Sequence, residues 1–358
     1  MSQPVSAAQP LPVRAELPPP VKTVLPPPVS KTLPAPTANA HIALLLPLNS
    51  SAFGRAAEAV KQGFMAASTI QAGTLPVKIY PSGDKVDDIV SAYSLATQAG
   101  ALIVAGPLTK NGVTALAASN QVTVPTLALN LPERDMDLPP QLYLLSLSAD
   151  IEARQIAKAA FAEGRKSATI IVSGGALEKR VQQAFAAEWP ILGGTVIDQF
   201  NFTGANTSAI QDALQKHAAD MLFLAMDGQD ARVLRPYLSP DIPTYATSQI
   251  YAGKNNPQKY YDLNGIQFVD MPWLLQPDHA AVMVYPRPQG GGADMERLYA
   301  LGIDAWRLAL MLQNIPPGKT LTLDGVTGQL NLDPASHQFT RTGVRAEFRD
   351  GEAVLPAP

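Results

Sequence analysis

The side chains of this sequence that could do chemistry are scattered and match no common catalytic motif. None of its four histidines stands in the HExxH spacing of a zinc peptidase: His41, His217, His279 and His337. The sequence contains no Walker-type phosphate loop, no GxGxxG fingerprint and no GxSxG nucleophile elbow. It has no cysteine, which excludes disulfides, thiolate metal ligands and cysteine nucleophiles. We therefore predict no catalytic residue, no metal site and no cofactor, and expect a protein that works by binding.

Two groups of acidic residues were the remaining candidates for acid–base chemistry. Asp84, Asp87 and Asp88 could form paired carboxylates, but they fit better as a polar loop and the first turn of a helix. Carboxylates at that position interact favourably with the helix dipole. Asp227 and Asp230 follow a predicted strand, and their spacing gives neither of them an acid or base partner. Neither group predicts an active site.

The composition favours a compact protein without a strong charge signature. Apolar residues make up 46% of the 358 residues, enough to bury a sizeable core, and charged residues only 16%. The formal net charge of −3 gives no electrostatic footprint for nucleic acid. No stretch reaches the roughly 18 apolar residues that span a bilayer. The N-terminal residues form neither an apolar signal core nor a lipid-accepting cysteine, so export and anchoring would need a segment that this sequence does not contain.

Residues 1–40 differ from the rest of the chain and predict a disordered, proline-rich spacer. They hold eleven of the 33 prolines and a repeated unit that begins LPPPVKTV at Leu17, LPPPVSKT at Leu25 and LPAPTANA at Leu33. Proline fixes φ and removes an amide donor, so these units favour polyproline II over helix or sheet. At about 3.1 Å per residue the repeats would reach roughly 75 Å. We considered three interpretations: a leader without a role, a semi-rigid tether, and a ligand for a proline-binding domain.

From His41 onward, short apolar runs alternate with helical patterns. Ile42 to Leu46 is a continuous apolar run, which is typical of a strand buried on both faces. A first series predicts strands at 42–46, 77–80, 101–106 and 123–130, with helices around 57–67, 89–99 and 113–119. A second series predicts helices around 153–160, 178–188 and 210–217, with strands at 168–174, 194–202, 219–226, 243–246 and 267–269. Repeated strand–helix units imply parallel sheets, and two series imply two similar α/β lobes.

Ligands of such sheets bind beyond the carboxyl ends of the strands. The residues that follow these ends are Asn49, Ser50, Ser51, Leu108, Thr109, Asn130, Ser173, Gly174, Asp227, Gly228, Ser248 and Gln249. If the two lobes face each other, these loops line one cleft. The candidates for contact with a ligand are Ser50, Ser51, Leu108, Thr109, Asn130, Ser248 and Gln249.

Two tryptophans need separate interpretations. Trp306 falls on the apolar face of a predicted helix with Leu301 and Leu308, so we expect it in the core. Trp273 follows a strand and is preceded by Pro272. It would either cover the crossing between the lobes or belong to a binding surface, and we favour the structural role.

A series of segments between residues 41 and 353 is recognisable when taken in order. The segments are IALLLPL from Ile42, GFMAA from Gly63, IVAGPL from Ile103, VPTLALN from Val124, SADIEARQIA from Ser148, ARVLRPYL from Ala231, YATSQIYAG from Tyr245, MPWLL from Met271, RLYALGIDAWRLA from Arg297 and GVTGQLNLD from Gly325. Through them the chain resembles the penicillin-binding protein activator family, the LppC/LpoA-type outer-membrane lipoproteins. The segments YATSQIYAG and RLYALGIDAWRLA together are its most specific features.

This resemblance implies a two-lobed type I periplasmic-binding-protein fold with parallel sheets flanked by helices. It implies a non-catalytic regulator that binds and stimulates a class A penicillin-binding protein, an enzyme that builds peptidoglycan. It further implies a periplasmic location, with a lipid anchor in the outer membrane as the only contact with a membrane. The spacer would then let an anchored globule reach through the peptidoglycan to an inner-membrane enzyme.

The resemblance also suggests how the chain divides. We expect a spacer at 1–40, a first lobe made of 41–147 and 271–318, and a second lobe made of 148–270 and 319–358.

Two other functions remain open. In a periplasmic solute receptor, an amino acid or peptide would occupy the cleft, its carboxylate held by hydroxyls and amides at strand ends, such as Ser50 or Thr109. The spacer favours the regulator, because a diffusing receptor needs little reach. A hydrolase of cell-wall material is the third possibility. For the regulator, a small ligand in the cleft that closes the lobes and alters the partner surface is a further hypothesis.

Overall fold

The computed structural model describes residues 39–71, 75–254, 257–313, 315–316 and 318–356. Residues 37–358 form one compact unit. The predicted spacer lies outside the described residues except for Asn39 and Ala40. Among the helices of the described part, none combines the length and apolarity needed to cross a membrane.

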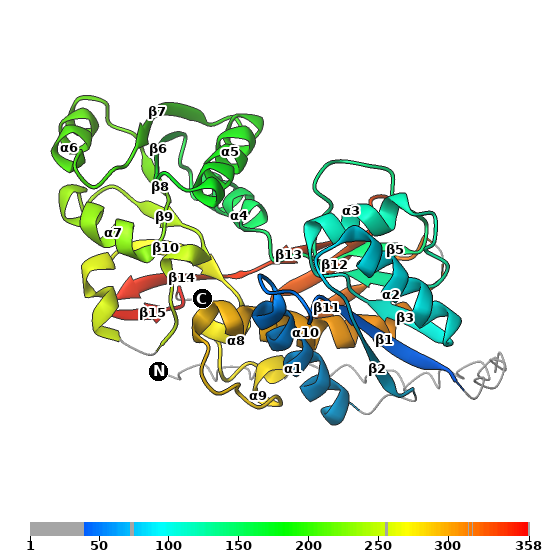
Figure 1. Ribbon diagram of the computed structural model, residues 1–358. Coiled ribbons are helices and arrows are strands. Elements are labelled where there is room, and N and C mark those ends of the chain that lie inside the picture. Colours follow the sequence, from blue (N-terminus) through cyan, green and yellow to red (C-terminus); the bar gives the residue numbers. More distant parts are fainter. Residues whose placement is uncertain (1–38, 72–74, 255–256, 314, 317, 357–358) are drawn as a thin grey trace, which may run out of the picture. The chain divides into compact units, whose positions relative to one another are not determined.

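The first lobe is built on an eight-stranded sheet in the order β11-β12-β13-β5-β4-β3-β1-β2 (Figure 1). Its strands are β1 (His41–Leu46), β2 (Val77–Pro81), β3 (Ala101–Ala105), β4 (Thr126–Ala128), β5 (Leu142–Leu144), β11 (Thr322–Asp324), β12 (Gln329–Asp333) and β13 (Gln338–Thr342). Strands β1 to β5 pair in parallel, while β11, β12 and β13 pair antiparallel with one another. Every residue of β1 is buried, as its apolar run predicted.

The second lobe is built on a seven-stranded sheet in the order β15-β14-β10-β9-β8-β6-β7. Its strands are β6 (Ser167–Val172), β7 (Thr195–Asn201), β8 (Met221–Ala225), β9 (Thr244–Ala246), β10 (Ile266–Asp270), β14 (Val344–Arg349) and β15 (Glu352–Val354). The five strands β6 to β10 pair in parallel, and β14 joins β10 antiparallel. Two parallel sheets flanked by helices confirm the predicted fold class for the described residues.

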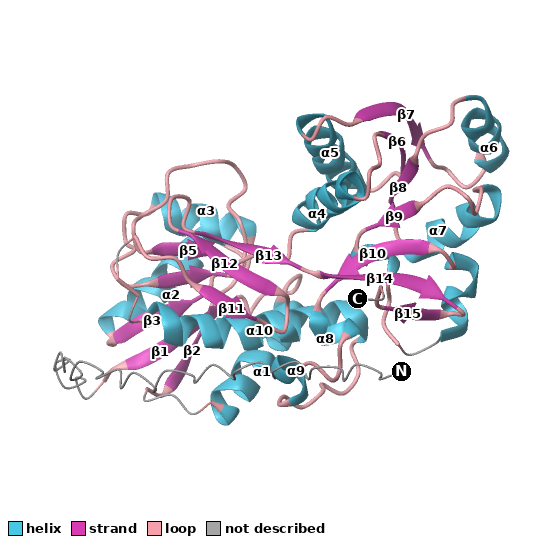
Figure 2. Ribbon diagram, turned by 180° about the vertical axis from the view of Figure 1, so that it is seen from behind, coloured by secondary structure: helices cyan, strands magenta, loops and turns pink. Residues whose placement is uncertain are grey.

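Helices cover both faces of the two sheets (Figures 1 and 2). The longer ones are α1 (Gly54–Ile70), α2 (Val86–Gln98), α3 (Lys110–Ala118), α4 (Ala149–Ala162), α5 (Ala176–Ile191), α6 (Thr207–Lys216), α7 (Gly228–Leu234) and α10 (Gly292–Leu312). The shorter ones are α8 (Pro272–Leu275), α9 (Ala280–Met283) and three 3₁₀ helices at Arg235–Tyr237, Ser248–Ile250 and Pro257–Leu263. Asp87 and Asp88 lie in the first turn of α2, as predicted.

Helices α1 and α10 approach so closely that two glycines are required at their contact. A Cβ atom on Gly63 would lie 1.9 Å from the carbonyl oxygen of Tyr299, and one on Gly302 would lie 2.0 Å from that of Val60. Trp306 is buried at this contact and meets the ring of Phe64 edge to face at 5.3 Å. The predicted core position of Trp306 is therefore confirmed.

Trp273 in α8 is fully buried, which supports its structural interpretation. Its indole nitrogen donates to Glu296 at 3.2 Å, and the guanidinium of Arg287 lies 4.0 Å from its ring centroid. The ring also lies 5.3 Å from that of Tyr299. The indole therefore packs inside the protein, and Arg287 covers one of its faces.

One predicted lobe boundary is wrong. We assigned residues 319–358 to the second lobe, but β11, β12 and β13 belong to the sheet of the first lobe, where Gln338 pairs with Leu144 of β5. Within residues 319–358, the chain crosses to the second lobe at Gly343, between β13 and β14. A Cβ atom there would lie 2.7 Å from Val269 and 2.9 Å from the carbonyl oxygen of Asp270, so the crossing strand passes closer than a side chain allows.

Candidate binding cleft between the two lobes

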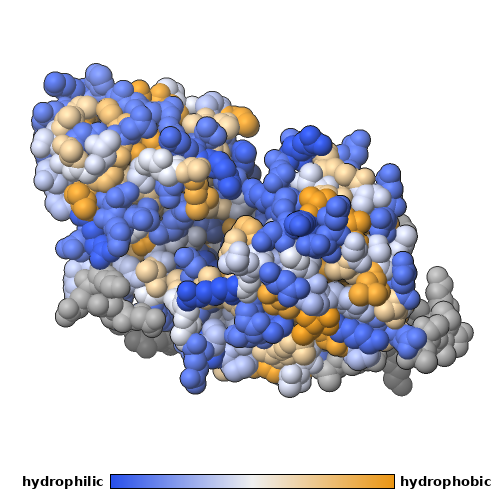
Figure 3. Space-filling model, in the orientation of Figure 1, coloured by the Kyte–Doolittle hydropathy of each residue, from blue (hydrophilic) through white to orange (hydrophobic). Residues whose placement is uncertain are grey.

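A cavity of about 520 Å³ lies between the lobes. Figure 3 shows the surface hollowed at this place. The first lobe contributes Leu108, Lys110, Leu129, Asn130, Ser146 and Leu147. The second lobe contributes Ser148, Ala149, Leu177, Arg180, Asp227, Ser248 and Gln249, and helix α10 adds Asp294, Arg297, Leu298 and Leu301. The carboxyl ends of both sheets thus meet at one cavity.

Four of the seven predicted ligand residues line this cavity: Leu108, Asn130, Ser248 and Gln249. The amide of Asn130 is already engaged, because it donates to the carbonyl of Leu108 at 3.0 Å and accepts from the backbone N–H of Leu131 at 2.9 Å. Asn130 therefore shapes the loop after β4. Gln249 differs, since its side-chain oxygen is buried and meets no hydrogen-bond donor among the described residues.

The other three predicted residues do not line the cavity: Ser50, Ser51 and Thr109. The hydroxyl of Ser50 accepts from the backbone N–H groups of Ala52 and Phe53, at 3.1 and 2.8 Å, and so holds the turn that leads into α1. Ser51 is exposed in the same turn, and Thr109 is the buried residue that precedes α3. Their strand-end positions were predicted correctly, but strand position does not fix the direction of a side chain.

Sequence reasoning placed Asp227 in the loops that line the cleft but missed its other charged residues, Lys110, Arg180, Asp294 and Arg297. Lys110 is the first residue of α3 and forms no ion pair within the described part of the chain. Arg180, on α5, pairs with Asp150 at 3.0 Å. Asp227 uses one carboxylate oxygen to cap α7. Their position in the sequence could have identified these residues. A helix that starts directly after a strand end turns its first residues toward the cleft.

The cavity is also rich in leucine, with side chains from both lobes and from α10: Leu108, Leu129, Leu147, Leu177, Leu298 and Leu301. Binding pockets are commonly apolar with a few polar groups that fix orientation, and their volumes run from about 300 to 1,000 Å³. Lys110 from the first lobe and Asp227 from the second supply opposite charges at this site. The lining therefore combines apolar side chains with groups of both charges.

Arg297 on α10 joins the cleft to a buried ion pair. Its Nη2 atom lies 2.6 Å from a carboxylate oxygen of the fully buried Asp270, and it also donates to the backbone carbonyls of Ser248 and Tyr251. Burial by itself would lower the pKa of Arg297, but the Asp270 carboxylate raises it above the ordinary value. The guanidinium therefore stays charged and fixes the backbone at Ser248.

A second buried pair lies beside the first. Arg341 on β13 donates to Glu152 on α4 at 2.6 Å, and both side chains are at most 5% exposed. The other carboxylate oxygen of Glu152 accepts from the backbone N–H of Ser248 at 3.0 Å. Ser248 is thus held through its N–H by one ion pair and through its carbonyl by the other.

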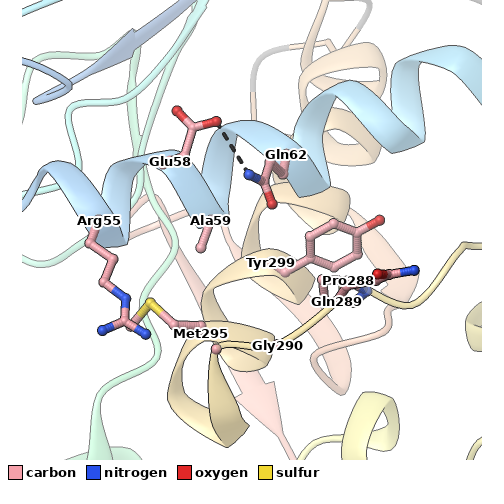
Figure 4. A pocket seen from close by; sticks show the side chains of 10 residues that line it. Arg55, Glu58, Ala59, Gln62, Pro288, Gln289, Gly290, Met295 and Tyr299 are labelled. Atoms are coloured by element: carbon pink, nitrogen blue, oxygen red, sulfur yellow. Dashed lines mark hydrogen bonds between the residues drawn. The ribbon is translucent and has the colours of Figure 1, made fainter.

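A smaller cavity of about 320 Å³ lies within the first lobe, between α1 and the start of α10 (Figure 4). Its lining includes Arg55, Glu58, Gln62 and Tyr299. Glu58 is already engaged, because it pairs with Lys61 at 2.6 Å and accepts from Gln62. In the described ranges, no three His, Asp or Glu side chains lie close enough together to hold a metal ion. The cleft between the lobes is the larger of these two cavities and gathers strand-end residues of both sheets, so it is the stronger candidate for a binding site.

The model of the family described as "LppC putative lipoprotein" matches residues 31–218 and 202–351. Among curated relatives, the "Penicillin-binding protein activator LpoA" of Pantoea ananatis is 27% identical over 332 residues, which covers 80% of this chain and 48% of that protein. The chain spans about half the length of the curated relatives it matches.

Two solved structures match nearly the whole described unit. One is a "putative branched-chain amino acid ABC transporter" from Chromobacterium violaceum, with 38% identity, a TM-score of 0.76, and coverage of 86% of this chain and 100% of that one. The other is the LpoA C-domain of Haemophilus influenzae, described as "a regulator of PBP1A", with 26% identity, a TM-score of 0.75, and coverage of 88% and 100%. These similarities confirm the predicted type I periplasmic-binding-protein fold.

Proposed function

The chain belongs to the LppC putative lipoprotein family, and from this premise we propose that it is a non-catalytic regulator of a class A penicillin-binding protein. It binds the synthase and increases its rate of peptidoglycan synthesis. The observation that carries this proposal is the similarity to the complete LpoA C-domain of Haemophilus influenzae, which is described as a regulator of PBP1A. The cleft supports a binding role, because its lining provides polar and apolar contacts without a recognisable catalytic set.

The proposed location is the periplasm, with the protein tethered to the outer membrane by a lipid anchor. The family description and the proline-rich residues 1–40 support this placement. Fractionation of cells that express the native gene, with detergent extraction of the membranes, tests it. A protein found only in the soluble periplasmic fraction would contradict the anchor.

The test of the proposed function is a binding titration of the 358-residue chain against each class A penicillin-binding protein of the source organism. Glycan polymerisation and peptide cross-linking are assayed in parallel. We expect saturable binding to at least one synthase, with a faster rate at saturation. A class B penicillin-binding protein serves as the control and should show neither effect. Absence of binding and of any rate change with every class A enzyme would refute the proposal.

A second candidate function is a solute receptor. The similarity to the structure from Chromobacterium violaceum favours it, since that protein is described as a putative branched-chain amino acid ABC transporter. Lys110 and Asp227 would then face the carboxylate and the ammonium of a free amino acid. Calorimetric titration with the common amino acids and with short peptides separates the two functions. Micromolar binding of a free amino acid, together with no binding to any synthase, would favour the receptor.

A further inference from the structure

The two lobes are tied to each other by buried side chains at the crossing. Arg341 belongs to the first lobe and Glu152 to the second, so their ion pair spans the crossing. Arg297 on α10, which packs on α1 of the first lobe, reaches Asp270 at the end of β10 in the second. Removing one partner of a buried ion pair leaves an uncompensated charge in the protein interior. A motion that separates α4 from β13 therefore carries a large free-energy cost.

The crossing strand itself is held through both backbone polar groups of one residue, Gly343. The side-chain amide of Gln155 on α4 donates to the carbonyl of Gly343 at 2.9 Å, and its oxygen accepts from the N–H of Gly343 at 3.0 Å. Figure 2 shows β13 of the first sheet continuing into β14 of the second. Gly343, the single residue between the two strands, is thus fixed to α4 of the second lobe.

The cleft is open in the structure, and its rim is exposed to solvent. Leu177 on the second-lobe rim is 39% exposed, and the side chain of Asp294 on α10 is 86% exposed. A receptor for a small solute encloses it by closing its lobes. The buried ion pairs Arg341–Glu152 and Arg297–Asp270, which link the two lobes, oppose such a motion. A cleft that stays open can instead accept a short segment that remains attached to a larger body.

We propose that the cleft between the lobes is a preformed docking groove for an extended segment of the partner protein. An aliphatic side chain of that segment packs among the leucines of the cleft. An acidic group of the segment faces Lys110 on the first lobe, and a basic group faces Asp227 on the second. Preorganisation lowers the cost of binding, because neither the groove nor the lobes must be reordered. The inference rests on the proposed function and names the surface through which the synthase is bound.

Two cleft variants, each with a matched control, test this inference. Lys110→Glu reverses the charge at the first residue of α3, and Lys179→Glu makes the same change at an exposed position of α5 outside the cavity. Leu177→Gln removes an apolar contact at the start of α5, and Ile191→Gln does so at its other end, where the side chain is 76% exposed. The dissociation constant for the synthase is measured by biolayer interferometry, with circular dichroism and thermal unfolding as checks of folding.

We expect each cleft variant to weaken binding about tenfold or more, and each control to change it less than about twofold. If the wild-type chain binds a synthase and the folded cleft variants bind it equally well, the inference is wrong while the proposed function stands. If the wild-type chain binds no class A synthase, the proposed function itself fails. Low micromolar binding of a free amino acid in the cleft that leaves the affinity for the synthase unchanged would show that the synthase does not use the cleft, which also overturns the inference.

Discussion

Glu152 and Arg341 are 189 positions apart in the sequence, yet Oε1 of one and Nη2 of the other lie 2.6 Å apart in the interior of the protein. The contact joins α4 of the second lobe to β13 of the first. Through Glu152 it also holds the backbone N–H of Ser248, whose residue lines the cleft. The relative position of the lobes and the shape of the cleft therefore depend on the same buried pair.

Replacing Arg341 alone should be strongly destabilising. Arg341→Met leaves the Glu152 carboxylate buried without its cation, and we expect the free energy of unfolding to fall by about 3–5 kcal/mol. The double variant Glu152→Met with Arg341→Met should recover part of this loss, because neither charge remains. Urea denaturation followed by circular dichroism measures both. Arg349→Met, which removes a largely exposed pair with Glu347, is the control and should lower the free energy of unfolding far less. A loss below about 1 kcal/mol in Arg341→Met would contradict this account.

Because buried ion pairs link the two lobes, we predict a single narrow distribution of the distance between them. The chain has no cysteine, so Ala118→Cys on α3 and Lys179→Cys on α5 allow clean double spin-labelling at exposed sites. Double electron–electron resonance should give a single narrow peak that saturating amino acids leave unchanged. The same labels in an Arg341→Met background should give a broader peak. Two resolved peaks in the wild-type background would show that the lobes open and close.

The contact between α1 and α10 should not tolerate a side chain at its glycines. Gly302→Ala places a Cβ atom 2.0 Å from the carbonyl oxygen of Val60, so the two helices must separate. We expect a loss of about 1–3 kcal/mol in the free energy of unfolding. Gly174→Ala is the matched control, because nothing lies within 4 Å of its added Cβ atom. Equal stability of the two variants would disprove the close contact.

Tyr245 should contribute to the loss of stability at alkaline pH. Burial, together with the hydrogen bond that its hydroxyl donates to Glu163, raises the pKa of Tyr245 to about 12. The unfolded chain releases this proton near pH 10, so the contribution is complete below pH 10 and is lost as the pH rises toward 12. Tyr245→Phe should therefore make the fall in unfolding free energy between pH 10 and 12 shallower, by up to about 1.4 kcal/mol per pH unit. Tyr261→Phe, at a position 53% exposed, is the control. An unchanged slope in Tyr245→Phe would contradict the prediction.

Much of the fold was predictable because it depends on local patterns. The apolar run from Ile42 and the helical pattern around 57–67 identified β1 and α1. Strands β11, β12 and β13 were assigned to the wrong lobe, because β12 and β13 show an alternating pattern that fits the edge of either sheet. Only the parallel pairing of Gln338 with Leu144 decides which sheet they join.

The sequence predicted where the candidate cleft lies, but only some of the residues that line it. Strand ends located Leu108 and Ser248 correctly, because the carboxyl ends of parallel strands gather at one edge of a sheet. The same rule misplaced Ser50, whose hydroxyl bonds to its own turn. It also gave no indication of Arg297, which enters the cleft from a helix far along the chain.

The sequence by itself determined the alternation of strands and helices, the two-lobed architecture and the family, because these follow from local periodicity and from segments in order. Only the tertiary structure decided which side chains meet at the crossing and which line the cleft. The physical reason is distance along the chain. Pairs such as Glu152 with Arg341 and Arg297 with Asp270 form when both lobes are assembled, and no local pattern records which distant charge will neutralise a buried one.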